Sequence, residues 1–143
     1  MIEKILLIYI SYILNGCNKE NPADNSKEEE IIYVSSGSFV SPFYKFYSDE
    51  EGKNQINENG ILKLNSNKIY TFRRFKEATS HPFDIKINND NEDLEDFELI
   101  KNNVNGIKGS ESLTIEFKNY QDKVEIIYYC TKHPNTMKKK IYF

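Results

Sequence analysis

The chain is poor in the residues that most metal and disulfide chemistry uses. Its 143 residues include two cysteines, two histidines, two methionines and no tryptophan. So few cysteines exclude a scaffold held by several disulfides, and the shortage of both cysteine and histidine excludes an array of zinc fingers. A site that needs three imidazoles is excluded as well. Because these residues are so few, their positions carry much of the functional information in the sequence.

A surplus of positive charge is also missing. The 19 basic residues are outnumbered by 22 acidic residues, which gives a formal net charge of −3. Domains that bind nucleic acid normally carry a basic surplus, so the balance argues against that class of partner. Aromatic residues, in contrast, make up 13% of the chain. The length and this apolar content suit one domain with a packed core.

No apolar run is long enough to cross a bilayer as a helix. The run over residues 5–14 has ten residues, whereas a spanning helix needs about 20. It fits the hydrophobic region of a secretory signal. The letters LNGC that follow end at Cys17 and resemble a bacterial lipobox, whose cysteine becomes lipidated. We therefore predict a signal peptide over residues 1–17 with lipidation at Cys17. An ordinary secretory signal and an uncleaved hydrophobic start are the alternatives.

A polar, acidic segment follows the predicted signal. Residues 18–30 contain five acids, two lysines and no large apolar side chain. Such a segment cannot bury enough surface to offset the entropy lost on ordering. We interpret it as a disordered tether between the membrane and a domain over residues 31–143. The expected location is the cell envelope, lipid-anchored in the periplasm or on the cell surface, with secretion as the alternative.

From residue 31 onward the apolar residues recur with period two, which is typical of β-strands. No amphipathic helix pattern is evident, and turn-rich stretches separate the strand patterns. Many short strands at fairly even spacing predict an all-β, antiparallel sandwich or barrel. The expected strands cover residues 31–34, 43–47, 61–64, 68–75, 83–87, 97–100, 112–117, 124–130 and 138–143.

The same alternation predicts where two chemically interesting residues point. Side chains two positions apart in a strand share a face. His81 is in phase with Phe83, Ile85 and Ile87, so we expect it to point into the core. Cys130 is in phase with the apolar residues of its own strand and is also expected to be inward.

The remaining sulfur and imidazole groups gather in one short loop between two predicted strands. The loop has the pattern C-x2-H-x3-M, with Cys130, His133 and Met137. Together with His81 it offers one thiolate, two imidazoles and one thioether. That donor set is the one of a mononuclear blue-copper centre, in which the methionine is a weak axial ligand. Zinc suits it less well, because methionine is not among the usual zinc ligands.

This pattern resembles the cupredoxins, the small blue-copper proteins that include plastocyanin and amicyanin. The resemblance implies a Greek-key β-sandwich over residues 31–143. It implies one Cu(I)/Cu(II) site with His81, Cys130 and His133 as equatorial ligands and Met137 as the axial ligand. It also implies that the protein carries single electrons, with His133 as the exposed edge for transfer, and that it is not an enzyme.

Each of these residues also has an ordinary structural interpretation. A buried cysteine is usually a small hydrophobe, and a lone histidine or methionine beside a strand is commonly part of the packing. Family order, spacing and facing together favour copper. Two other functions stay open: a copper storage or delivery protein, and a metal-free cupredoxin-like binding module on the cell surface. A multicopper oxidase would need more histidines, and a dinuclear site would need two neighbouring cysteines.

The expected partners are redox proteins and the membrane. The stretch from Asp90 to Glu98 holds six acids in nine residues. It is either a docking patch for a cationic redox partner, where charge complementarity raises the association rate, or a solvated loop. Docking near His133 is the other expected mode. The membrane contact would be made by the lipid on Cys17, and the chain is expected to be a monomer.

Pro82 is a departure from the plastocyanin pattern, which usually has asparagine after the first histidine. The backbone N–H of that asparagine can donate to the thiolate sulfur, and proline has no N–H. Hydrogen bonds to the ligands tune a metal site. Our hypothesis is that one hydrogen bond to the thiolate sulfur is missing and that the reduction potential is lower as a result. Ser80 or Thr131 could hold the two ligand loops together instead.

Overall fold

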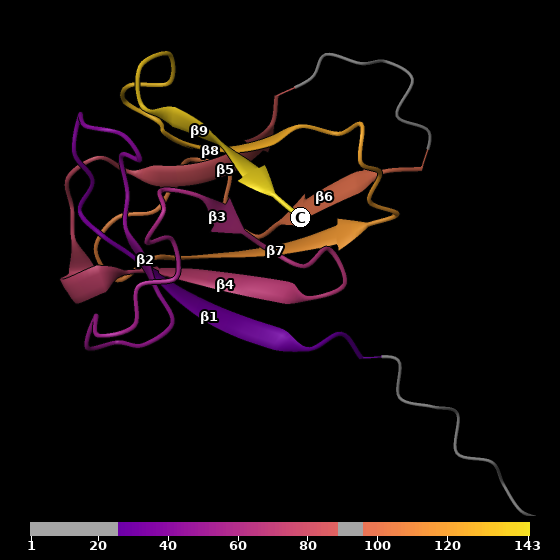
Figure 1. Cartoon of the computed structure of the whole chain (residues 1–143), viewed down its shortest axis with the longest axis horizontal. Coiled ribbons are helices and arrows are strands. Elements are labelled where there is room, and N and C mark those ends of the chain that lie inside the picture. Colours follow the sequence, from indigo (N-terminus) through magenta and orange to yellow (C-terminus); the bar gives the residue numbers. More distant parts are fainter. Residues whose placement is uncertain (1–25, 89–95) are drawn as a thin grey trace, which may run out of the picture.

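The computed structural model describes residues 26–88 and 96–143 (Figure 1). The predicted signal peptide with Cys17, most of the predicted tether and residues 90–95 of the acidic stretch lie outside the described residues. Within the described ranges, no helix has the length and apolarity that a membrane crossing requires. The only helical element there is a single 3-10 turn, η1 (Phe75–Glu77).

Nine strands in the described ranges form two sheets that pack together as a sandwich. The five-stranded sheet has the order β2-β1-β4-β7-β6, and the four-stranded sheet has the order β3-β9-β8-β5. The first sheet contains β1 (Glu29–Val34), β2 (Phe46–Tyr47), β4 (Ile69–Arg74), β6 (Glu98–Lys101) and β7 (Ser112–Lys118). The second contains β3 (Leu62–Lys63), β5 (Phe83–Ile87), β8 (Ile126–Cys130) and β9 (Lys138–Tyr142).

The prediction of an all-β sandwich is confirmed, and each expected strand overlaps an observed one. The expectation of purely antiparallel sheets is wrong, because β1 pairs with β4 in parallel and β3 pairs with β9 in parallel. Apolar alternation reports which face of a strand is buried and not the direction of its neighbour. β1 also begins at Glu29, two residues before the expected start of the domain, because Glu29 and Glu30 pair with β4. The Greek-key assignment stays a prediction.

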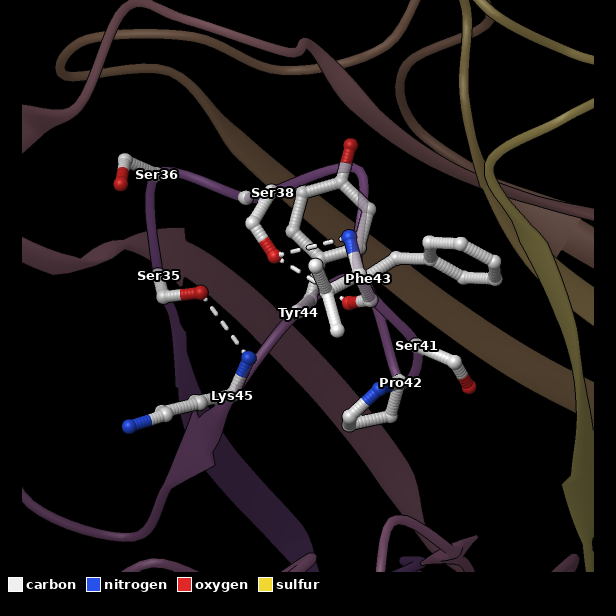
Figure 2. Close-up of a pocket in the computed structure, with 10 residues that line it drawn as sticks. Ser35, Ser36, Ser38, Ser41, Pro42, Phe43, Tyr44 and Lys45 are labelled. Carbon is white, nitrogen blue, oxygen red and sulfur yellow. Dashed lines mark hydrogen bonds between the residues drawn. The ribbon is translucent and has the colours of Figure 1, made fainter.

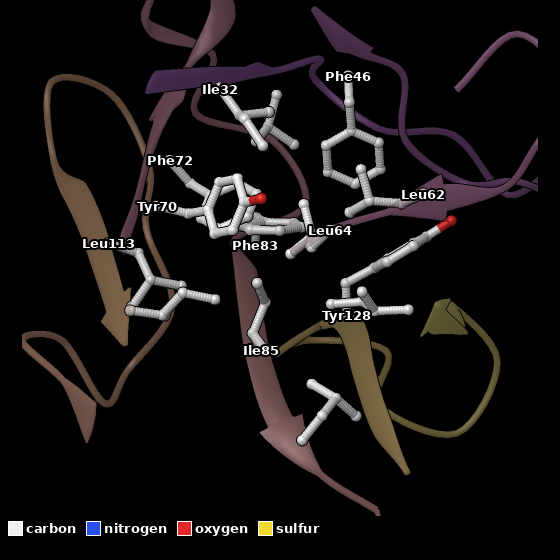
Figure 3. Close-up of a cluster of buried hydrophobic side chains, with 14 of the residues drawn as sticks. Ile32, Phe46, Leu62, Leu64, Tyr70, Phe72, Phe83, Ile85, Leu113 and Tyr128 are labelled. Carbon is white, nitrogen blue, oxygen red and sulfur yellow. The ribbon is translucent and has the colours of Figure 1, made fainter. Parts of the chain in front are cut away.

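Aromatic and aliphatic side chains together fill the core between the sheets (Figure 3). The ring centroid of Phe83 lies 5.3 Å from that of Tyr44 and 5.3 Å from that of Phe72. Phe46 and Tyr128 join the cluster with centroids 5.1 Å apart. Each fully buried side chain of this size contributes roughly 1.5–3 kcal/mol to folding. These aromatic contacts therefore help to join the two sheets, together with the aliphatic side chains of the same core.

One polar residue of β5 is buried against the alternation of its strand. Asp84 is 1% exposed. Its carboxylate accepts hydrogen bonds from Lys101 Nζ at 2.6 Å and from Tyr129 Oη at 3.0 Å. Lys101 is on β6 of the other sheet. A buried carboxylate needs such partners, so this ion pair links the two sheets.

Candidate metal centre

Three of the four predicted ligands meet at one end of the sandwich. The nearest ligand atoms of His81, Cys130 and His133 all lie within 4.8 Å of one another. Cys130 Sγ lies 3.4 Å from His133 Nδ1 and 3.9 Å from His81 Nδ1. The two imidazole centroids are 5.2 Å apart. Cys130 is fully buried and is a free thiol, while both histidines are half-buried. The group is able to hold a metal ion.

The hairpin between β8 and β9 positions Cys130, His133 and Met137 by local backbone bonds. The amide of Cys130 donates to the carbonyl of Met137 at 2.9 Å, so these residues face each other across the hairpin. Two further bonds close the turn. The amide of His133 donates to the carbonyl of Cys130, and the amide of Met137 donates to the carbonyl of His133. Met137 is fully buried and belongs to the core. The spacing C-x2-H-x3-M is therefore the spacing of one tight turn.

His81 reaches the cluster from a different position than the sequence predicts. The expectation that it points into the core with Phe83 and Ile85 is wrong, because His81 is half-buried and lies in a bend before β5. Pro82 has no N–H to pair, and the strand begins only at Phe83. His81 also has φ +47°, a left-handed conformation that costs a non-glycine residue roughly 1 kcal/mol. This backbone turn directs its ring to Cys130.

A short network of backbone bonds joins the two ligand segments. Phe83 is opposite Cys130 in the β5–β8 pair, and the amide of Thr131 donates to the carbonyl of Pro82 at 3.0 Å. Phe83 also exchanges two backbone bonds with Ile107. Ser80 or Thr131 was expected to hold the two ligand loops together, and Thr131 does so through its backbone amide.

The loop after β1 covers the cluster and was not recognised in the sequence. The ring of Phe39 makes edge contacts with the imidazoles of His81 and His133, at centroid distances of 5.0 and 4.9 Å. It is 64% exposed. Gly37, at φ +87°, passes so close that an added Cβ would lie 3.0 Å from His81 Cβ and 2.9 Å from Tyr44 Cε1. A glycine followed by an exposed aromatic residue is the signal that could have indicated this loop.

A hollow of about 410 Å³ lies beside the same loop and is lined by residues of the range 35–45 (Figure 2). Two of its serine hydroxyl groups are engaged within the loop. Ser35 Oγ accepts a hydrogen bond from the amide of Lys45 at 2.9 Å. Ser38 Oγ donates to the carbonyl of Val40 at 3.1 Å. Ser35 and Ser38 therefore stabilise the shape of the loop that carries Phe39.

Two further residues missed by the sequence reasoning lie beneath His81. Arg74 is 4% exposed, and Tyr44 Oη donates to the carbonyl of His81 at 2.8 Å. Burial raises the pKa of Tyr44, and the nearby Cys130 raises it further. Arg74 follows Tyr70 and Phe72 at period two on β4. That phase indicates an inward arginine and could have been read from the sequence.

The electrostatic surroundings favour the neutral form of His81, which is the form that binds metals. Burial is the main cause that lowers its pKa, and His133, Arg74 and Lys132 lower it further. Two of the donor distances also suit a shared ion. Bonds of about 2.0–2.3 Å to an imidazole nitrogen and a thiolate sulfur place two such donors roughly 3.5–3.8 Å apart. The observed sulfur–nitrogen distances of 3.4 and 3.9 Å lie close to that range.

Comparisons with protein-family models, curated proteins and solved structures found no match. The candidate metal centre rests on the geometry and chemistry of the chain's own residues.

Proposed function

We propose that the chain is a type 1 copper protein that carries single electrons at the cell envelope. The observation that supports this most directly is the group of His81, Cys130 and His133 at one end of an all-β sandwich. Met137 lies opposite Cys130 in the same hairpin. One thiolate, two imidazoles and a thioether are the donors of a blue-copper site. The similarity to cupredoxins noted in the sequence is part of the proposal.

Bound copper would supply exchange of one electron between Cu(II) and Cu(I), with a reduced partner as donor and an oxidised partner as acceptor. The chain's own residues provide a rigid, shielded site. Cys130 is fully buried, and its backbone is fixed by Met137 on one side and by Phe83 on the other. Ligands that are held in place move little when the charge on the metal changes, which suits a carrier.

The imidazole of His133 is the proposed route for the electron. It is half-buried and contacts the exposed ring of Phe39. Cys130 is shielded from solvent by comparison. A redox partner that docks on this end of the sandwich would approach the metal through His133 and Phe39. No substrate is turned over in this function.

Addition of Cu(II) to the metal-free domain tests the proposal. One equivalent is expected to bind and to give an intense visible thiolate-to-copper band. Cys130→Ser should abolish the band, while Cys130→Ser and the parent protein should show similar cooperative melting when metal-free. Lys132→Ala, next to the ligands in the same turn but exposed, is the matched control and should keep the band.

Other outcomes separate the alternative functions. Uptake of Cu(I) without a stable Cu(II) band would favour storage or delivery. The absence of stoichiometric copper binding would contradict the proposal and favour a metal-free binding module.

The proposed location depends on Cys17 and is tested separately. Mass spectrometry of the mature protein produced in a bacterial host should find an N-terminal diacylglyceryl-modified Cys17. A soluble mature form that lacks lipid would support the ordinary secretory signal instead.

A further inference from the structure

A buried guanidinium lies under the candidate metal centre. Arg74 is 4% exposed at the end of β4. No carboxylate of the described residues forms an ion pair with it. Its Nη1 and Nη2 atoms donate instead to four backbone carbonyls, those of Ser35, Ser80, His81 and Ile107, at 2.8–3.0 Å. A buried charge is costly unless it is hydrogen-bonded. These four hydrogen bonds offset the cost of burying Arg74, and they show which parts of the backbone the guanidinium holds.

The four carbonyls belong to three segments that build the metal centre. Ser35 begins the loop that carries Gly37 and Phe39 over the imidazoles. Ser80 and His81 form the first ligand segment. Ile107 exchanges backbone bonds with Phe83, which is opposite Cys130. A single rigid fork of donors thus reaches every segment around the cluster except the β8–β9 hairpin itself.

The carbonyl of His81 accepts two side-chain hydrogen bonds in this arrangement. Arg74 Nη1 donates to it at 3.0 Å and Tyr44 Oη donates to it at 2.8 Å. His81 has φ +47°, a conformation that a histidine adopts only when its surroundings hold it there. Tyr44 and Arg74 also contact each other, with the guanidinium carbon 5.8 Å from the ring centroid.

We propose that Arg74 and Tyr44 form a clamp that holds His81 in its left-handed, metal-ready conformation and that the charge of Arg74 favours the reduced state of the site. The second part rests on the proposed copper function. Arg74 and Tyr44 are positioning residues, because they act through the backbone of His81. A fixed positive charge near the metal disfavours Cu(II) more than Cu(I), so it raises the reduction potential.

The clamp itself is tested without any metal. Hydrogen–deuterium exchange of residues 76–82 is compared in the parent protein and in Arg74→Gln, Arg74→Lys and Tyr44→Phe. Exchange should be about tenfold faster in Arg74→Gln and Tyr44→Phe, since each loses hydrogen bonds to the His81 carbonyl. The segment 112–118 should be unchanged. Arg73→Gln, an exposed neighbour on the same strand, is the matched control and should behave as the parent.

The effect on the metal is tested with Cu(II) and a redox titration. Loss of a residue that orients a ligand typically lowers metal affinity by about tenfold or more. We expect that loss in Arg74→Gln and Arg74→Lys, because a lysine cannot span four carbonyls. The reduction potential should be lower in Arg74→Gln than in the parent protein. It should be closer to the parent value in Arg74→Lys, which keeps the charge. A purely structural role would not produce this split.

The outcomes are distinguishable. Unchanged exchange of residues 76–82 in Arg74→Gln and Tyr44→Phe would overturn the clamp. Equal potentials in Arg74→Gln and the parent would overturn the electrostatic role. If the Arg74 variants do not melt cooperatively, Tyr44→Phe decides the matter, since it removes only one bond to the same carbonyl. If the parent protein binds no copper while the exchange changes as expected, the proposed function fails and the clamp on His81 stands.

Discussion

The amide of Thr131 donates a hydrogen bond to the carbonyl of Pro82 at 3.0 Å. The residue after Cys130 thus holds the residue after His81, and this backbone bond extends the β5–β8 pairing to the two ligand segments. This bond uses the carbonyl of residue 82 and needs no N–H there, so it is compatible with proline. Ser80, the other residue expected to join these segments, donates instead to the carbonyl of Ser36.

Pro82→Asn should raise the reduction potential of the copper-loaded protein. The new N–H can donate to the thiolate of Cys130 and withdraw electron density from the metal, while the bond from Thr131 to the carbonyl remains. Redox titration is the measurement. Pro134→Asn, after the other histidine and exposed, is the control and should change the potential less. An unchanged or lower potential in Pro82→Asn would refute the hypothesis.

Met137→Leu should keep the fold and shift the potential upward. The two side chains have similar volumes, so the loss of stability is expected to stay below about 1.5 kcal/mol. Removing the axial thioether withdraws a donor that tunes the potential of a blue-copper site. Ile141→Leu, at a fully buried position in β9, is the control and should leave the potential unchanged. Equal potentials in both variants would exclude Met137 as a ligand.

Gly37→Ala should lower both stability and copper affinity. The substitution forces a side chain to φ +87° and places a Cβ 3.0 Å from His81 Cβ. Gly109→Ala provides the comparison, because its φ is +58° but its nearest neighbour is at 4.0 Å. Both variants should lose about 1 kcal/mol of stability from backbone strain, and only Gly37→Ala should bind Cu(II) more weakly. Thermal unfolding measures the stability and Cu(II) titration measures the affinity. Equal Cu(II) affinities in the two variants would show that the loop after β1 does not support His81.

Asp84→Asn should destabilise the sandwich by about 3 kcal/mol, because it leaves Lys101 partly buried without its carboxylate partner. The side chain of Lys101 is 14% exposed and that of Asp84 is 1% exposed. Glu98→Gln, which breaks the exposed pair with Lys118, should cost about 0.5 kcal/mol or less. Urea unfolding of the metal-free protein measures both. Similar losses in the two variants would show that the Asp84 pair does not link the sheets.

Stability should fall in alkaline solution through Tyr129. Burial, followed by the charge of Asp84 and the hydrogen bond to it, raises the pKa of Tyr129 from 10.0 to about 12. A raised pKa in the folded state stabilises the protein below pH 10, and this contribution is lost as the pH rises from 10 to 12. The stability difference between the parent and Tyr129→Phe should shrink over that interval. Tyr142→Phe, at an exposed position, is the control, and an equal pH profile in both variants would contradict the assignment.

The sequence predicted much of the fold because strand alternation is a local property. In β7, the buried residues Leu113, Ile115 and Phe117 alternate with residues that are less buried, and nothing distant is needed to see this pattern. The same locality made Cys130, His133 and Met137 a recognisable group, since one hairpin holds all three. The parallel pairing of β1 with β4 has no local signal and was missed.

His81 shows the limit of that reasoning. Alternation from β5 placed it in the core, whereas its positive φ turns it to Cys130. That conformation depends on Tyr44 and on Arg74, and both come from segments outside its own strand. The phase of Arg74 within β4 was visible in the sequence, but its four carbonyl partners were not.

The amino-acid sequence alone predicts where the strands lie, most of their buried faces and the order of the four donor groups. These follow from the period of apolar side chains and from the spacing within one turn. The packing of the sheets and loops brings His81 Nδ1 to 3.9 Å from the sulfur of Cys130, 49 residues later in the chain, and places a buried arginine beneath His81. Such distances depend on how two sheets and three loops pack together, and no local pattern encodes that packing.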